Sequence, residues 1–234
     1  MQFNIHQQIF EKYPQLLVGL LVCKNIENGP APVALTTRLR SAESALRSRI
    51  PNPDDLKSNP VIAAWQEAHR AFGSNPNKFP SSIHALCKRV IKGGELPAIS
   101  TLVDLYNIVS LNHMLPVGGE DLNRCKGNIV LTVAVGTEPF TALGSTGNEP
   151  PEPGEIIYRD DEGVLCRKFN WREATRTCLT GNTTSTVLVI EAIPPTTRVQ
   201  LESALNELQD LVQKFCGKDA TRAILDSTHL VHNF

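Results

Sequence analysis

The most regular group of chemically useful side chains lies between residues 103 and 110. Asp104, Asn107 and Ser110 are three residues apart, and on a helix this spacing places side chains on roughly one face. A carboxyl, an amide and a hydroxyl group that converge in this way can hold a hydroxyl, an amide or a water molecule. The same spacing is typical of an ordinary solvated helix face, and spacing alone favours that simpler interpretation.

Two adjacent glycines, Gly118 and Gly119, stand in the segment 116–122. Because glycine has no Cβ, the backbone there can approach a ligand closely, and its N–H groups can contact an anion or a carbonyl. The alternative is an ordinary turn between a helix and a strand, capped by Asp121. The pattern alone favours the turn.

The segment 169–177 combines an aromatic ring, basic groups and hydroxyls, and it includes Asn170, Trp171, Arg172 and Thr177. Tryptophan and arginine together suit a nucleobase, because one stacks and the other pairs with a phosphate or carboxylate. The alternative is a loop whose tryptophan fills the core while its arginines form surface salt bridges. The sequence supports the two interpretations equally.

Glu191 ends the apolar run 187–190. A carboxyl group at the end of a buried strand is often desolvated and ready for a functional role. The alternative is a structural acid paired with a nearby arginine. Of the six histidines only His113 lies near these four clusters, and a lone histidine is more often structural than catalytic.

No stand-alone catalytic motif is present. The sequence has no Gly-x-Ser-x-Gly elbow, phosphate loop, His-Glu-x-x-His pair or dinucleotide fingerprint. The six cysteines are widely spread, without a CxxC pair, so we expect no zinc knuckle. Neither a metal nor an organic cofactor is predicted.

Composition places the chain among ordinary globular proteins. It has 234 residues, 41% hydrophobic residues and a net charge of −1, which argues against a strongly basic nucleic-acid sheath and leaves room for a local basic patch. We expect no secretory signal, and the apolar run 16–22 is too short to span a bilayer. The expectation is a cytoplasmic protein with reduced thiols and no membrane partner.

The elements that must position these clusters follow from periodicity and from chain-breaking residues. We predict a short opening helix and a buried strand over 16–22, then helices over 33–49, 60–72, 81–91 and 100–112. The second half predicts strands over 129–135, 155–158, 164–168, 187–191 and 221–225, and an amphipathic helix over 197–215. A helical first half and a strand-rich second half indicate the α+β class.

Taken in order, several blocks resemble the B3/B4 domain, the tRNA-editing domain of the bacterial phenylalanyl-tRNA synthetase beta subunit. The blocks are Leu96-Pro97-Ala98-Ile99-Ser100, Val103-Asp104-Leu105-Tyr106-Asn107, Pro116-Val117-Gly118 and Val189-Ile190-Glu191-Ala192. The resemblance covers about 79–193, and Asn170-Trp171-Arg172 is similar to free-standing members. It implies a mixed or antiparallel sheet flanked by helices in one domain, with a family-specific part over 1–78, a core over 79–216 and a tail over 217–234.

In the synthetase this domain hydrolyses tyrosine wrongly attached to tRNA. Its pocket uses the Asn of Val-Asp-x-x-Asn and the Glu of Leu-Glu-x-Ala, which Asn107 and Glu191 match. Gly118 stands where the family has a histidine, and Asn170-Trp171-Arg172 replaces a Gly-rich loop. These departures argue against a simple transfer of tyrosine specificity.

The resemblance implies trans-editing, the hydrolysis of a mischarged aminoacyl-tRNA at the tRNA 3′ end. Glu191 would hold the substrate amino group or orient a water, and Asn107 and Ser110 would position the water or the ribose hydroxyls. Arg172 would contact the terminal adenosine or its phosphate. The other predicted substrate-binding residues are Trp171, Asn170, Asp104, Gly118, Gly119 and Thr177. The alternatives are a binding module without turnover, which the glycine at 118 favours, and an interaction protein that uses the helix over 197–215.

Overall fold

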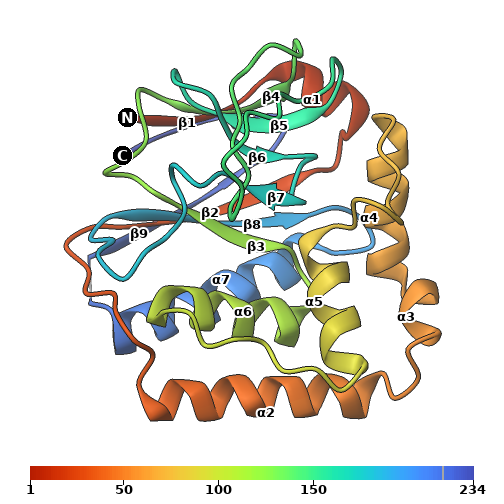
Figure 1. Cartoon of the computed structure of the whole chain (residues 1–234), viewed down its shortest axis with the longest axis vertical. Helices are drawn as coiled ribbons and strands as arrows, with labels where there is room; N and C mark the ends of the chain where they lie inside the picture. Colours follow the sequence, from red (N-terminus) through yellow and green to blue (C-terminus); the bar gives the residue numbers. More distant parts are fainter. Residues whose placement is uncertain (218) are drawn as a thin grey trace.

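The computed structural model describes residues 1–217 and 219–234; Lys218, in the predicted C-terminal tail, lies outside the described residues. Two sheets pack face to face, and a layer of helices covers the outer face of one of them (Figure 1). The α+β class predicted from the sequence is confirmed.

The larger sheet has six strands in the order β10-β1-β4-β5-β6-β7. Its strands are β1 (Gln2–Ile5), β4 (Ile129–Val133), β5 (Ile156–Arg159), β6 (Val164–Arg167), β7 (Arg172–Glu173) and β10 (Val231–Asn233). The pair β1–β4 is parallel and the other pairs are antiparallel. The sheet is therefore mixed.

The smaller sheet has four antiparallel strands in the order β3-β8-β2-β9. They are β2 (Leu17–Cys23), β3 (Val117–Asp121), β8 (Thr186–Ala192) and β9 (Ala220–Leu225). The central strands β2 and β8 are almost continuously apolar because the other sheet covers one face and helices cover the opposite face.

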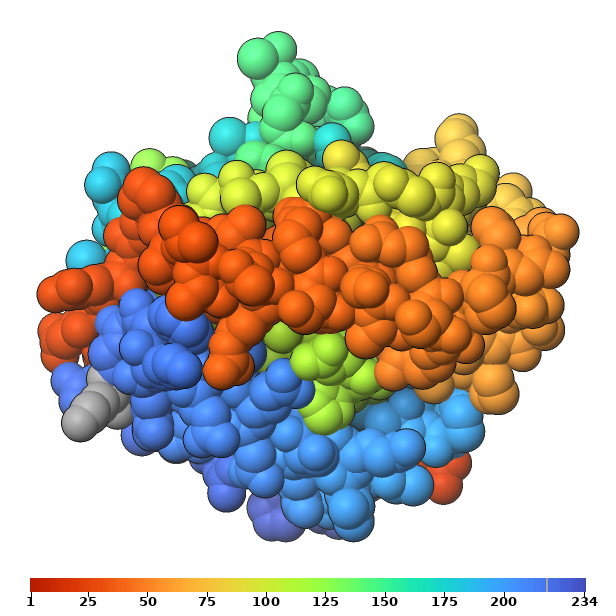
Figure 2. Space-filling view, turned by 90° about the horizontal axis from the view of Figure 1, so that it is seen from below, coloured from red at the N-terminus to blue at the C-terminus, as the bar shows by residue number. Residues whose placement is uncertain are grey.

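Three long helices, α2 (Val33–Arg49), α6 (Thr101–His113) and α7 (Arg198–Phe215), lie beneath the four-stranded sheet. The inner pair α6 and α7 contacts the sheet, and α2 packs outside α6. Seen from below, α2 runs across the surface beside α7 (Figure 2). Gly19 of β2 allows the close packing of α7, because a Cβ there would lie 2.8 Å from Leu205 Cδ1.

Four shorter helices complete the fold: α1 (Gln7–Lys12), α3 (Asp55–Ser58), α4 (Pro60–Ala71) and α5 (Ser82–Ile91). Asn59 caps α4 with its side-chain oxygen, and Pro60 occupies the first turn. Helix α5 packs against α2 and α6. No helix formed by the described residues is both long and apolar enough to cross a membrane.

The predicted long helices and most predicted strands agree with the structure to within about two residues. The short elements β1, β7, β10 and α3 were not predicted. The segment 116–122, for which the sequence favoured a turn, is largely strand β3, because it completes the edge of the sheet beside β8. All six cysteines are free.

Candidate functional site

A cavity of about 270 Å³ lies between the two sheets and is bounded by α5 and α6. Its walls are mainly apolar and aromatic, with Phe3, Leu86, Ile129 and Val189 among them. The volume is close to the lower end of the range of about 300–1,000 Å³ found for small-molecule sites. The cavity therefore suits a small ligand or one end of a larger one.

Glu191 is the acid at the end of β8, and it lines this cavity. It is only 4% exposed. The Tyr158 hydroxyl donates to Oε1 at 2.7 Å and the Asn170 amide donates to Oε2 at 2.8 Å. Burial raises the pKa of Glu191 from 4.5 to about 7, although both hydrogen bonds act in the opposite direction. The carboxyl group can thus accept or donate a proton near neutral pH.

Asn107 lines the same cavity from α6. It is 6% exposed, and within the described part of the chain no hydrogen bond holds its side-chain amide. An amide that has no protein partner and faces a cavity can pair with a ligand or a water molecule there. Asn107 and Glu191, predicted from separate motifs, therefore face one hollow.

Two further acids, Glu120 of β3 and Glu173 of β7, line the cavity and were not predicted as site residues. The two carboxyl groups are neighbours, and each one influences the pKa of the other. Burial and the neighbouring acid raise the pKa of Glu120 well above 4.5, and burial raises the pKa of Glu173. Glu120 is two residues after Gly118, and on a strand residues two apart lie on the same face. This spacing could point to Glu120 only if 117–121 had been recognised as a strand.

Asn170 and Trp171 enter the cavity from the turn between β6 and β7. The two preceding residues have left-handed backbone angles, with φ 49° at Lys168 and 67° at Phe169. Non-glycine residues seldom adopt this conformation, and the surrounding structure must stabilise it. Phe169 helps, because its buried ring packs edge-on against Trp65 and Tyr13.

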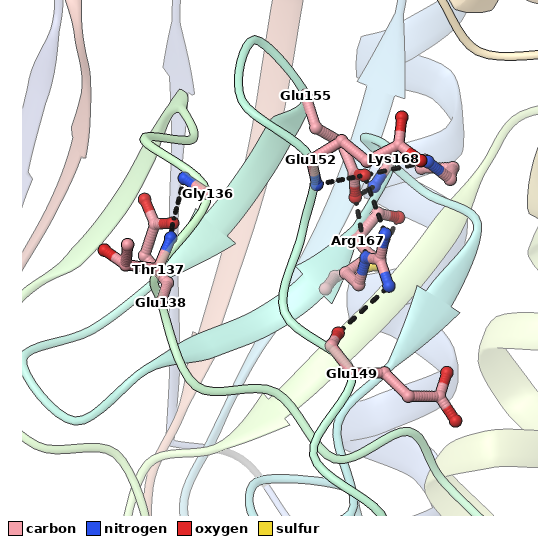
Figure 3. Close-up of polar contacts among 9 residues, drawn as sticks. Gly136, Thr137, Glu138, Glu149, Glu152, Glu155, Arg167 and Lys168 are labelled. Carbon is pink, nitrogen blue, oxygen red and sulfur yellow. Dashed lines mark hydrogen bonds and ion pairs between the residues drawn. The ribbon is translucent and has the colours of Figure 1, made fainter.

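A buried charge cluster fixes the same turn (Figure 3). The Glu155 carboxylate accepts hydrogen bonds of 2.8 Å from Arg167 Nε, Arg167 Nη2 and Lys168 Nζ. It also accepts from the Lys168 backbone N–H at 3.1 Å. These contacts lower the pKa of Glu155 in spite of its burial. Glu155 thus anchors the turn that presents Asn170 to Glu191.

His69 of α4 extends the polar network behind Asn170. Its Nδ1 lies 3.1 Å from the Phe79 carbonyl oxygen, and its Nε2 lies 3.3 Å from Asn170 Oδ1. Burial lowers the pKa of His69 to about 4. In a neutral ring the proton must be on Nδ1 for the ring to donate to the Phe79 carbonyl. Nε2 is then an acceptor and needs a hydrogen-bond donor opposite it. Rotation of the Asn170 amide would supply that donor and would turn its oxygen toward a protonated Glu191, which would link the two ionisations through Asn170.

The remaining predicted residues fall into two groups. Trp171, Gly118 and Gly119 line the cavity, whereas Arg172 is exposed and donates to the Leu143 carbonyl at 2.9 Å. Gly119 leaves no room for a side chain, because a Cβ would lie 2.6 Å from Leu188 Cδ2.

Asp104, Ser110 and Thr177 are buried and do not line the cavity. The Ser110 hydroxyl donates to the Leu115 carbonyl at 2.6 Å, and Asp104 accepts from the Ile99 N–H at 3.1 Å. The simpler interpretation of a solvated face for Asp104, Asn107 and Ser110 is wrong, because all three are buried inside the protein. His113 pairs with Glu207 at 2.7 Å, away from the cavity.

The cavity contains no activated nucleophile among its described lining. Burial raises the pKa of the Cys166 thiol well above 9.0, and the nearby acids raise it further. Burial also raises the pKa of the Tyr106 hydroxyl. No group of three or more His, Cys, Asp or Glu side chains in the described residues is arranged to hold a metal ion. Within the described lining, Glu191 has a pKa of about 7, which suits the transfer of a proton near neutral pH.

Comparisons with known proteins give a weak structural likeness and a clear family match. No curated protein matches this sequence. Among solved structures, an N-terminal fragment of the phenylalanyl-tRNA synthetase beta subunit from Pyrococcus horikoshii is similar, at 11% sequence identity and a TM-score of 0.44. The similarity covers 93% of this chain but only 49% of that fragment. Residues 64–217, more than half of the sequence, match the B3/4 domain. The chain belongs to the B3/4 domain family.

Proposed function

We propose that the chain hydrolyses the ester that joins a wrongly attached amino acid to the 3′ end of a tRNA. The observation that carries the proposal is that Asn107 and Glu191, which match the editing motifs of the synthetase domain, line one small cavity. Family membership adds support, since the B3/4 domain of the synthetase beta subunit acts on tRNA. The cavity volume of about 270 Å³ suits the aminoacyl group, with the terminal adenosine outside it.

In the proposed reaction a water adds to the ester carbonyl carbon while Glu191, as carboxylate, accepts a proton from it. The bond between the carbonyl carbon and the ribose oxygen then breaks, and Glu191 returns the proton to that oxygen. The products are the free amino acid and the tRNA hydroxyl. A donor such as the Asn107 amide, placed at the developing oxyanion, is worth about 3–4 kcal/mol in comparable sites.

Groups outside the cavity would hold the tRNA. The exposed Arg172 adjoins Trp171 and Glu173, which line the cavity, so it can meet the terminal adenosine or its phosphate. Ser110, Asp104 and Thr177 are left out of the proposed site because they do not line the cavity.

A second candidate is a binding module that recognises an aminoacyl group without turnover. The observation that favours it is Gly118, which stands in the cavity where the synthetase domain has a histidine.

A deacylation assay over a panel of mischarged tRNAs distinguishes the two functions. We expect Glu191→Gln and Asn107→Ala each to lower the rate about 100- to 1,000-fold. The matched controls are Glu202→Gln, on the exposed surface of α7, and Asn112→Ala, which removes an α6 amide that is bonded to Glu207 outside the cavity. Binding of aminoacyl-tRNA without turnover by the wild type would support the module instead.

A further inference from the structure

The two sheets bring an unusual carboxyl pair together inside the cavity. Glu120 is 6% exposed, and it meets Glu173 from the opposite sheet. The Oε2 atoms of both side chains are buried, and within the described residues no donor lies at hydrogen-bonding geometry to either atom, although the Thr177 hydroxyl is near Glu120 and the Cys166 thiol is near Glu173. A proton on one carboxyl group would let it donate to the other, and the pair would then carry one negative charge.

The pair faces a cavity in which the described lining residues include no basic side chain. Glu120, Glu173 and Glu191 are the carboxylic acids of this described lining, which contains no lysine, arginine or histidine. Arg176 acts on Glu120 from a distance, but its guanidinium is bonded to Asp160 at 2.6 Å. A buried negative charge surrounded by apolar walls is stabilised by a bound cation. The apolar and aromatic walls of the cavity suit an organic cation.

Asn107 is an independent sign of a polar ligand. The residue is more than nine-tenths buried, it lines the same cavity, and no hydrogen bond from the described chain holds its side-chain amide. An amide N–H donates to a carbonyl oxygen, whereas an ammonium group donates to carboxylates. A ligand that carries an ammonium group next to a carbonyl would therefore satisfy both Asn107 and the carboxyl pair.

We propose that the Glu120–Glu173 pair binds the protonated α-amino group of an aminoacyl substrate with an apolar or aromatic side chain. This inference rests on the proposed function and makes it more specific. The apolar walls then hold the side chain, Asn107 contacts the carbonyl oxygen, and Glu191 remains available to orient the water. Gly118 keeps the subsite open, because a Cβ there would lie 3.2 Å from Glu173 Oε1.

Calorimetric titration of the full chain with two amides tests the pair. L-phenylalaninamide carries a free amino group, whereas N-acetyl-L-phenylalaninamide has the same side chain and a neutral nitrogen. We expect the wild type to bind the first compound at least about tenfold more tightly, as for hydrogen bonds to charged groups. Glu120→Gln and Glu173→Gln should each abolish this preference, and Glu162→Gln, an exposed acid outside the cavity, should retain it.

Gly118→Ala is a second variant that keeps every charge. Its Cβ displaces the Glu173 carboxylate by a few tenths of an ångström, so we expect it to weaken binding of L-phenylalaninamide several-fold. Near-UV circular dichroism establishes that each variant is folded. Equal affinity of the wild type for the two amides, or an undiminished preference in folded Glu120→Gln, would overturn the inference.

Deacylation measured on the same proteins separates this inference from the proposed function. Hydrolysis of mischarged tRNA by a wild type that shows no preference for the free amino group would refute the subsite alone. A preference that depends on Glu120 and Glu173, in a protein that hydrolyses no mischarged tRNA, would support the subsite and refute the editing function.

Discussion

The Tyr158 hydroxyl donates a 2.7 Å hydrogen bond to the Glu191 carboxyl group, and this contact joins the two sheets across the cavity. Tyr158 belongs to β5 of the six-stranded sheet and Glu191 to β8 of the four-stranded sheet. The ionisation of Glu191 is therefore coupled to the packing of one sheet on the other.

Tyr158→Phe removes the only hydroxyl donor to Glu191 among the described residues. Because that bond stabilises the carboxylate, its loss should raise the pKa of Glu191 above about 7. The free energy of unfolding should fall by about 1–2 kcal/mol at alkaline pH. Carbon NMR of labelled glutamate measures the pKa. Tyr13→Phe, which loses a 2.8 Å bond to the Ala68 carbonyl, should leave Glu191 unchanged.

Glu191 should make the protein less stable as the pH rises. Its pKa is 4.5 when unfolded and about 7 when folded, so between these values the folded state binds more protons than the unfolded state. Stability attributable to this group is present below pH 4.5 and falls up to about pH 7, by about 3 kcal/mol. Urea unfolding of Glu191→Gln and wild type measures the difference, and parallel pH profiles for the two would contradict the expectation.

His69 should act in the opposite direction. Its pKa is 6.5 when unfolded and about 4 when folded, so the unfolded state binds more protons in this window. Stability should fall by about 3 kcal/mol as the pH drops from 6.5 to 4. In His69→Gln this acid-side decline should disappear. His229, which is exposed, provides the control: His229→Gln should keep the decline of the wild type.

Glu155→Gln leaves the buried Arg167 and Lys168 without their carboxylate. We expect the free energy of unfolding to fall by about 3–5 kcal/mol, the usual result of breaking a buried ion pair by removing one partner. Because the cluster holds the turn before Trp171, tryptophan fluorescence should change as well. Urea unfolding checks the first effect.

The matched control for Glu155 is Glu67→Gln, which breaks an exposed pair with Arg70. It should change stability by no more than about 0.5 kcal/mol. A loss as small as this in Glu155→Gln would show that the buried cluster does not hold the turn.

Much of the fold follows from local patterns. The helices over 33–49, 60–71 and 198–215 are bounded by proline, a capping asparagine or a capping box, all of which act within one turn of the chain. Strand β8 follows from an unbroken apolar run. Strands β1 and β10 were not predicted because they are short. They lie at opposite ends of the chain and are stabilised by pairing with each other.

Some residues of the candidate site could likewise be predicted from local sequence patterns, and others could not. Asn107 and Glu191 could be chosen from their motifs alone, and both line the cavity. Ser110 shares the helical spacing of Asn107, but α6 is buried on more than one side, so spacing did not distinguish a cavity residue from a core residue. Arg172 and Glu173 are adjacent in sequence, yet the alternation of a strand exposes the first and turns the second into the cavity.

The sequence by itself determined the α+β class, the long helices and three of the polar side chains of the cavity, because periodicity, capping and motif order are local properties. Only the tertiary structure decided that Glu120, Glu173 and Tyr158 join them in the cavity and that His69 lies behind Asn170. Those residues come from different sheets and helices, and contacts between distant segments are set by how the layers pack rather than by any spacing along the chain.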